Sequence, residues 1–213
     1  MRNAFLNNFI NFKKVLGPNI VCMNHLILIL LLTTFGFSQK DIRLDNASFE
    51  GERQDATVPT GWQPCAEGTT PDILPGFWGV KLDPFEGESY MGLITRDDGT
   101  FESIGQRLSG PLKTGDCYRF SLALANSKDY AGYNKPIKLV IYGGRTNCSK
   151  DQLLISTEYI SHQDWKKYTF QFVPEKDLNY IIFEAQYMDG LYFHYKGNIL
   201  VDDCSVFKLC DRA

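Results

Sequence analysis

The chain has 213 residues, of which 44% are hydrophobic, and its formal net charge is −3. Three of its 22 Lys and Arg residues lie within residues 1–38, which leaves 19 against 25 Asp and Glu in the remainder. This length suits one domain with a sizeable core, and the lack of a basic run argues against nucleic acid as a partner.

The N-terminal 38 residues have the pattern of a secretory signal peptide. Two lysines precede an uninterrupted Leu/Ile run at Leu26–Leu32, and the small residue Ser38 precedes the polar chain. The run is too short for a membrane span, which needs about 20 apolar residues. We therefore expect export, with a mature domain at residues 39–213 that has no membrane span. A retained membrane anchor is the alternative, and Met23 is an alternative start.

After residue 40, short segments rich in aromatic and β-branched residues alternate with turn clusters, and no stretch has helical periodicity. We predict one all-β domain in which two antiparallel sheets pack face to face as a jelly-roll β-sandwich. The continuously apolar Asn179–Ala185 should lie in the middle of a sheet. Strands are predicted, in chain order, at Ile42–Asn46, Gly79–Leu82, Ser89–Thr95, Phe101–Leu108, Cys117–Ala125, Ile137–Tyr142, Leu153–Glu158, Lys167–Val173, Tyr180–Tyr187 and Asn198–Phe207.

The first and last segments carry carboxylates, which strands generally avoid. Glu50 lies in Leu44–Gly51, and Asp202 and Asp203 lie in Asn198–Val206. This pattern predicts that the two terminal segments pair, with an oxygen-ligated calcium ion beside them. Because alternate strand residues face opposite ways, only one of Asp202 and Asp203 should bind the ion, and Asp202 is preferred. The alternative is that these acids cap turns or face water.

Five cysteines follow residue 38, which in an exported chain predicts up to two disulfides and one leftover thiol. Cys204 and Cys210 lie six residues apart on one predicted strand, too far apart to bond with each other. If the strand at Cys117 runs antiparallel beside the last strand, Cys117 falls near Cys210. We therefore predict a Cys117–Cys210 disulfide. A cysteine metal site is not expected, since there is no CxxC pair.

Most aromatic side chains of a sandwich pack in its core. Trp78 differs because it lies in a Pro/Gly loop, where an exposed aromatic residue more often has a binding role. Together with Arg96 and Glu102 it forms our predicted ligand patch, and Tyr195 is a further residue whose ring could stack on a sugar. No HExxH or nucleophile-elbow pattern is present, so no catalytic residue is predicted.

Several motifs resemble those of galactose-binding-like jelly-roll domains, which include carbohydrate-binding modules of secreted glycanases. The motifs are Asn46–Gly51, Gly61-Trp62, Gly87–Tyr90, Ile104–Leu108, Gly115–Ser121 and Val201–Val206. A closer resemblance is to exported domains of Bacteroidota surface proteins, including gliding-motility-associated and OmpA-like proteins, where segments similar to Pro75–Trp78, Arg96–Gln106 and Tyr195–Asp202 recur. The resemblance implies a jelly roll, often with a structural calcium on the first and last strands, and usually no catalysis.

These observations predict a non-catalytic, exported, carbohydrate-binding module of the bacterial cell surface, whose partner is a glycan or another cell-envelope component. One alternative is a structural or adhesive envelope component without a sugar ligand, in which the unpaired cysteine could link to a partner. A third is a jelly-roll polysaccharide lyase or hydrolase. The first two differ in whether Trp78 and its neighbours are exposed in one groove or scattered.

Overall fold

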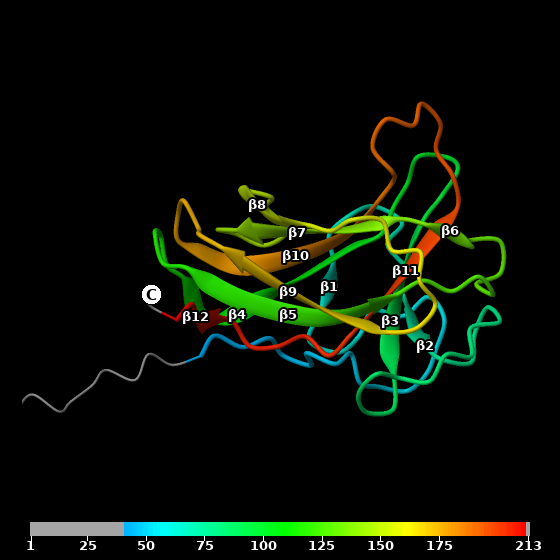
Figure 1. Ribbon diagram of the computed structural model, residues 1–213, viewed down its shortest axis with the longest axis horizontal. Coiled ribbons are helices and arrows are strands. Elements are labelled where there is room, and N and C mark those ends of the chain that lie inside the picture. The colour runs from blue at the N-terminus through cyan, green and yellow to red at the C-terminus, as the bar shows by residue number, and fades with distance from the viewer. Residues whose placement is uncertain (1–40, 212–213) are drawn as a thin grey trace, which may run out of the picture. The chain divides into compact units, whose positions relative to one another are not determined.

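The computed structural model describes residues 41–211, and the predicted signal peptide lies outside them. Figure 1 shows two β-sheets packed face to face. Every regular element of residues 41–211 is a β-strand, so the predicted all-β sandwich is confirmed. In that range no helix has the length and apolar character to cross a membrane.

The first sheet has five antiparallel strands in the order β1-β4-β10-β7-β8. Their bounds are Gln63–Pro64 (β1), Ser103–Leu112 (β4), Leu178–Gln186 (β10), Lys138–Gly144 (β7) and Gln152–Ser156 (β8). The continuously apolar β10 pairs with β4 on one side and β7 on the other, as predicted for a central strand.

The second sheet has seven strands, with β12-β5-β11-β3-β2 as its main path, β9 on β5 and β6 on β11. Their bounds are Asp72–Leu74 (β2), Tyr90–Thr95 (β3), Tyr118–Ala125 (β5), Lys135–Pro136 (β6), Lys166–Phe172 (β9), Gly197–Asp202 (β11) and Lys208–Leu209 (β12). Within this sheet β6 and β11 run parallel, and the other pairs are antiparallel.

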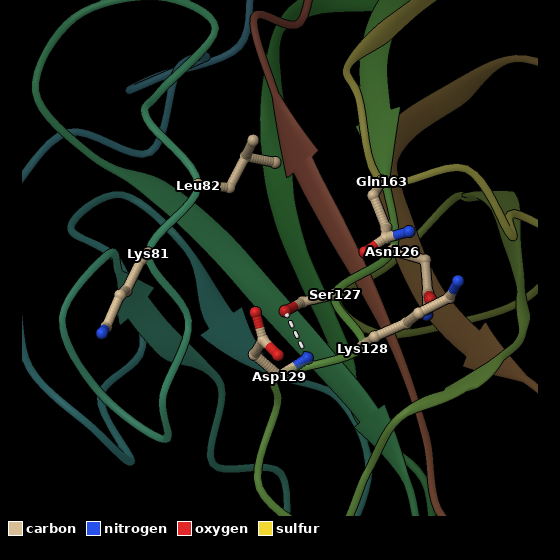
Figure 2. Close-up of a pocket in the computed structure, with 7 residues that line it drawn as sticks. All are labelled: Lys81, Leu82, Asn126, Ser127, Lys128, Asp129 and Gln163. Atoms are coloured by element: carbon tan, nitrogen blue, oxygen red, sulfur yellow. Dashed lines mark hydrogen bonds between the residues drawn. The ribbon is translucent and has the colours of Figure 1, made fainter.

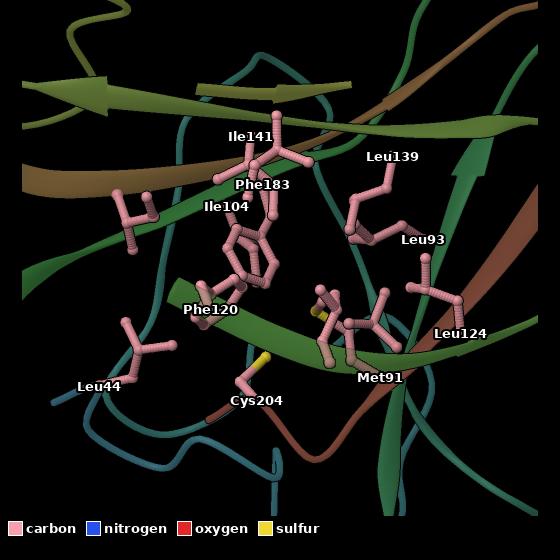
Figure 3. Packing of buried hydrophobic residues seen from close by; sticks show 14 of the residues in the cluster. Leu44, Met91, Leu93, Ile104, Phe120, Leu124, Leu139, Ile141, Phe183 and Cys204 are labelled. Carbon is pink, nitrogen blue, oxygen red and sulfur yellow. The ribbon is translucent and has the colours of Figure 1, made fainter. Parts of the chain in front are cut away.

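The main core lies between the two sheets, where alternate side chains of each strand point inward. Phe183 of β10 packs edge-on against Phe120 of β5, with ring centroids 6.3 Å apart, and Phe120 stacks on Phe207 at 4.4 Å. Figure 3 shows Phe183 and Phe120 at the centre of this layer. Burial of each such ring stabilises the fold by about 1.5–3 kcal/mol.

The two terminal segments lie side by side, as predicted. Ile42 and Phe207 exchange backbone hydrogen bonds of 3.2 and 2.8 Å in an isolated antiparallel bridge. The predicted first strand, however, is wrong beyond Ile42, because Asn46 has a left-handed backbone with φ of 47°. Its side chain accepts a hydrogen bond from the Glu50 N–H at 2.7 Å. This local bonding closes a turn and competes with a strand ladder.

Two other predicted strands need correction for the same kind of reason. Gly79–Leu82 lies in a loop, since Trp78 and Gly79 both have positive φ. The last long strand ends at Asp202 because Asp203 adopts a φ of 47°. The short strands β1, β2, β6 and β12 were not predicted, because two or three residues carry too little periodicity to be recognised.

Two disulfides join distant segments. The predicted Cys117–Cys210 bond is confirmed, because β12 lies beside β5 and places the two Cα atoms 5.4 Å apart. The second bond joins Cys65 to Cys148, whose Cα atoms are 5.2 Å apart. Cys204 is free but buried. The idea that it links the domain to a partner is therefore wrong for the folded state.

Candidate functional site

Trp78 is an exposed aromatic residue in a strained loop. Its side chain is 46% exposed, and its φ of 53° is unusual for a bulky residue. Its carbonyl accepts a 2.8 Å hydrogen bond from Ala131 in the segment that follows β5. The predicted exposure of Trp78 is thus present, and packing against a second loop fixes its position.

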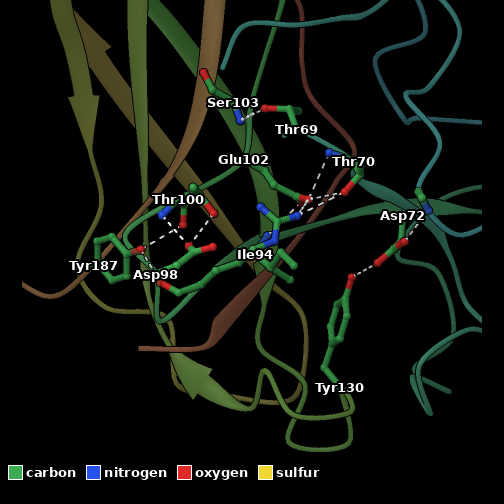
Figure 4. A network of polar contacts seen from close by, with 12 residues as sticks. Thr69, Thr70, Asp72, Ile94, Asp98, Thr100, Glu102, Ser103, Tyr130 and Tyr187 are labelled. Atoms are coloured by element: carbon green, nitrogen blue, oxygen red, sulfur yellow. Dashed lines mark hydrogen bonds and ion pairs between the residues drawn. The ribbon is translucent and has the colours of Figure 1, made fainter. Parts of the chain in front are cut away.

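Arg96 and Glu102 lie together as an ion pair in which Glu102 is buried and Arg96 is partly exposed. Glu102 is fully buried, and Arg96 donates to it at 2.7 Å (Figure 4). The Glu102 carboxylate also accepts from the backbone N–H groups of Thr70 and Ile94, at 3.1 Å each. Burial raises the pKa of Glu102 to about 7, although Arg96 and these hydrogen bonds act in the opposite direction. Glu102 cannot reach a surface ligand, so its predicted ligand role is wrong.

A second buried acid lies in the same polar network. Asp72 of β2 accepts hydrogen bonds from the Tyr130 hydroxyl and from the Ala56 N–H (Figure 4). Burial raises the pKa of Asp72, while the donors from Tyr130, Ala56 and the Trp78 side chain lower it. Gly92 makes room for this network, since a Cβ there would lie 3.0 Å from the Tyr130 hydroxyl. These hydrogen bonds hold the Asp72 carboxylate inside the domain, so it is not available to a surface ligand.

An open cleft of about 270 Å³ lies elsewhere, between the β3–β4 turn, the segment entering β6, and residues 187–196, which we call the aromatic loop. Figure 1 shows the aromatic loop projecting from the domain between β10 and β11. Of the four predicted ligand residues, only Tyr195 lines this cleft. The lining residues are Asp97, Gly132, Asn134, Lys135, Phe193, His194, Tyr195 and Lys196.

The β3–β4 turn that forms one wall is closed by local hydrogen bonds. The Asp98 carboxylate accepts from both the backbone N–H and the hydroxyl of Thr100, at 2.9 and 2.7 Å. These bonds lower the pKa of Asp98. Gly99 takes the positive φ that the turn requires, 92°. Asp97, at the start of this turn, is thereby held facing the cleft.

The base of the aromatic loop is tied down, whereas its tip is exposed. The Tyr187 hydroxyl donates to the Arg96 carbonyl at 2.6 Å, and the Tyr195 hydroxyl accepts from the Met188 N–H at 2.9 Å. Tyr195 itself is only 4% exposed, so it contributes to the floor of the cleft. Phe193 is 60% exposed and Tyr192 is fully exposed. Two aromatic faces are therefore available to a ligand.

Charged side chains stand next to these rings. The Lys135 Nζ atom lies 6.0 Å from the Phe193 ring centroid and 5.5 Å from that of Tyr195. The Lys196 Nζ atom lies 3.5 Å from an Asp97 carboxylate oxygen. Aromatic faces combined with a few polar groups suit a ligand that has both apolar and hydroxyl-bearing surfaces.

The predicted calcium residues are engaged by other partners in this structure. Asp202 is fully buried and accepts from the backbone N–H groups of Phe85 and Glu86 at 2.8 and 3.0 Å. Burial raises its pKa to about 7. The Glu50 carboxylate accepts from the Glu88 N–H at 3.1 Å, and Asp203 pairs with Lys167, whose charge would oppose a cation.

The predicted ligand pair, Glu50 with Asp202, thus accepts hydrogen bonds from backbone N–H groups of residues 85–88. In residues 41–211 no group of three or more His, Cys, Asp or Glu side chains is placed to hold a metal ion. The expectation of calcium therefore rests on the sequence motif alone.

A second, smaller hollow of about 190 Å³ lies beside the segment that follows β5 (Figure 2). It has no aromatic lining, and the Ser127 and Asn126 side chains are already engaged in internal hydrogen bonds. It is therefore a weaker ligand candidate than the cleft. The lining residues are Lys81, Leu82, Asn126, Ser127, Lys128, Asp129 and Gln163.

No protein-family model matches the sequence, and the search of curated proteins finds no match. Solved structures do match the fold. The CBM22-1 xylan-binding domain of Xyn10C from Paenibacillus barcinonensis is 16% identical, with a TM-score of 0.51 over 81% of this chain and 97% of that one. The K3 cleaved adhesin domain of Lys-gingipain from Porphyromonas gingivalis W83 is 15% identical, with a TM-score of 0.50 over 78% and 98%.

The chain has the jelly-roll fold of these domains. A third match is to an arabinose-bound MgGH51 α-L-arabinofuranosidase, with a TM-score of 0.54 and 10% identity. The aligned region covers 78% of this chain and 26% of the arabinofuranosidase chain. At these identities the likeness concerns the fold, and the function of the site depends on its own residues.

The sequence reasoning missed most of the cleft. Asp97, Asn134, Lys135, Phe193 and Lys196 come from three segments, and nothing local marks them as neighbours. One signal was available, because the aromatic loop places Tyr, Phe, His and Tyr in succession directly after a turn at Gly190. Aromatic residues clustered in a long loop more often serve binding than packing.

Proposed function

We propose that this domain is a non-catalytic carbohydrate-binding module of an exported bacterial surface protein, and that its ligand binds in the cleft beside the aromatic loop. One observation carries the proposal. The exposed face of Phe193 lies in the same open cleft as Asp97, Asn134 and Lys135. A pyranose ring offers a C–H face for stacking and hydroxyl groups for those polar side chains, so both kinds of surface are matched.

The composition of the cleft supports a binding role over hydrolysis. Enzymatic cleavage of a glycosidic bond usually uses two carboxylates on either side of that bond. Asp97 is the one carboxylate among the eight lining residues, and it lies beside Lys196. The buried acids Glu102 and Asp72 are held by internal donors. A hydrolase activity therefore has little support in this cleft.

Export is supported by the covalent structure. The Cys65–Cys148 and Cys117–Cys210 disulfides each join segments more than 80 residues apart. Disulfides of this kind persist in oxidising compartments such as the periplasm or the cell exterior. This agrees with the secretory pattern of residues 1–38. We infer an envelope or extracellular location.

The alternative is a structural or adhesive component that binds no sugar. Its support is the scatter of the predicted patch, since Trp78 is exposed while Glu102 is buried and Tyr195 lies in a separate cleft. The tip of the aromatic loop, with exposed Leu191 and Tyr192, would then contact a protein partner. The two functions differ in whether the isolated domain binds any glycan.

A glycan array with the purified domain, followed by titration calorimetry on the best ligand, tests the proposal. We expect Phe193→Ala to weaken binding at least about tenfold, because the variant removes the stacking surface. Trp78→Ala should have little effect if the cleft is the site, and a large effect if the predicted loop patch binds instead. Leu153→Ala is the matched control, since Leu153 is exposed to a similar degree, 54% against 60% for Phe193, but lies on β8. Absence of any glycan binding above background would favour the structural alternative.

A further inference from the structure

We propose, building on the proposed function, that the sugar bound in the cleft is acidic and that its anionic group pairs with Lys135. Lys135 is exposed, and within residues 41–211 no carboxylate oxygen lies within 4.0 Å of its Nζ atom. Lys196, the other lysine of the cleft, is already compensated by Asp97. The cleft therefore presents one uncompensated positive charge.

The position of Lys135 is defined by the backbone. It begins β6, where it pairs with Gly197 of β11, and its carbonyl accepts a 3.4 Å hydrogen bond from the Asn126 side chain. A Cβ at Gly197 would lie 2.8 Å from that carbonyl, so the two strands approach closely. Lys135 is thus presented from a paired strand, and its charge is held near the rings of Phe193 and Tyr195.

The formal charge of the residues that line the cleft is opposite in sign to the net charge of the domain. Lys135, Lys196 and Asp97 are its charged lining residues, which gives a formal charge of +1 with His194 neutral. The chain after residue 38, in contrast, carries 19 basic and 25 acidic residues. A negatively charged polysaccharide would be repelled by the domain as a whole, so a local positive site is required to hold it. A neutral glycan would need no such charge.

The geometry matches a sugar that carries a carboxylate or a sulfate. The ring of such a sugar can stack on the exposed face of Phe193, while its anionic group forms a charge-assisted hydrogen bond with the Lys135 ammonium. The exposed Asn134 side chain, next in the chain, can bond to a neighbouring hydroxyl. Carboxylate and sulfate share this chemistry, and the experiment separates them.

Binding is measured by calorimetry with pairs of oligosaccharides that differ only in charge. Uronate oligosaccharides are compared with their carboxyl-reduced forms, and sulfated oligosaccharides with their desulfated forms. We expect one acidic form to bind about tenfold more tightly than its neutral partner. The preference should shrink in high salt, because a partly exposed ion pair is screened. The chemical class that shows the preference identifies the anionic group.

Variants assign the preference to one side chain. Lys135→Gln should abolish the difference between acidic and neutral forms and retain the binding of the neutral form. Lys166→Gln, which removes an exposed lysine of β9 outside the cleft, should change neither. Equal affinity of the wild-type domain for both forms, together with loss of both in Phe193→Ala, would overturn this inference and leave the proposed function intact. If neither form of any pair binds while another glycan on the array does, this inference fails and the proposed function stands. If no glycan on the array binds either, both proposals fail.

Discussion

Glu50 and Asp202 hold the same loop from two ends of the chain. The Asp202 carboxylate accepts from the N–H groups of Phe85 and Glu86, and the Glu50 carboxylate accepts from that of Glu88. Both acids therefore satisfy backbone donors of the segment that leads into β3. Their occurrence near the terminal segments is explained by this anchoring, whether or not an ion also binds.

Removal of the Asp202 carboxylate should destabilise the domain strongly. In Asp202→Ala two partly buried hydrogen bonds from the Phe85 and Glu86 N–H groups are lost and a cavity is left at a fully buried side chain, which together cost about 2–4 kcal/mol of the free energy of unfolding. Asp203→Asn is the matched control. This variant removes the partly exposed ion pair between Asp203 and Lys167, and asparagine tolerates the positive φ of this position. The loss in the free energy of unfolding should therefore stay below about 1 kcal/mol. Urea denaturation measures both, and equal losses would contradict the anchoring role of Asp202.

A substitution at Gly87 tests how much the hydrogen bond between the Glu88 N–H and the Glu50 carboxylate contributes to stability. Gly87 and Gly115 both have positive φ, of 69° and 80°, so alanine costs about 1–2 kcal/mol at each position from backbone conformation alone. A Cβ at Gly87 would also overlap the Glu50 carboxylate, whereas nothing lies within 4 Å at Gly115. We expect Gly87→Ala to cost at least about 1 kcal/mol more than Gly115→Ala, because Glu50 must give up its hydrogen bond to Glu88. Equal losses would show that the Glu50 contact contributes little.

Stability should rise as the pH falls from about 8 towards 5. Burial raises the pKa of Glu102 and of Asp202 to about 7, well above their values in an unfolded chain. The folded state therefore binds protons that the unfolded state releases, and this stabilisation is lost as the pH rises through 7. Glu102→Gln should flatten the dependence of the free energy of unfolding on pH between 5 and 8. An unchanged slope in the variant would refute the assignment to Glu102.

Below about pH 4 the trend should reverse. Hydrogen bonds from Lys113 and Thr114 lower the pKa of Asp177 to about 2. Protonation of this exposed carboxylate removes those interactions, so the contribution of Asp177 to stability declines as the pH falls through its lowered pKa.

Cys204 should be unreactive in the folded domain. The thiol is buried, which raises its pKa well above the usual value and keeps it protonated. A thiol reagent such as DTNB should label one thiol in the domain of residues 39–213 in denaturant without reductant, and almost none in native buffer. Fast labelling of the native domain would revive the idea of a linkage through this residue.

The structural calcium ion that the sequence motif predicts can be tested by its effect on thermal stability. Because Glu50 and Asp202 face N–H donors and Asp203 faces Lys167, we expect the melting temperature in EDTA to equal that in excess calcium within about 1 °C. A rise of several degrees on addition of calcium would show that these carboxylates rearrange around an ion, as the resemblance to calcium-bearing jelly rolls implied.

Local patterns were sufficient for the fold class and for most long strands. The alternation of Lys167–Val173 predicts a strand with one solvated face, and the continuous apolar run of Asn179–Ala185 predicts a central strand, because side chains of a strand alternate between its faces. They correspond to β9 and β10. The Cys117–Cys210 bond followed from spacing and an antiparallel arrangement. Local hydrogen bonding at Asn46 and positive φ at Asp203 were not visible in those patterns.

The sequence by itself determined an all-β sandwich with adjacent terminal segments, since periodicity and turn chemistry act between near neighbours. Only the tertiary structure decided that Glu102 is buried beneath Arg96, and that Asp97, Lys135 and Phe193 meet in one cleft. The burial of a side chain and the meeting of residues in one cleft depend on how segments far apart in the chain pack together. No local sequence pattern specifies that packing. The site of binding is therefore a property of the packed loops.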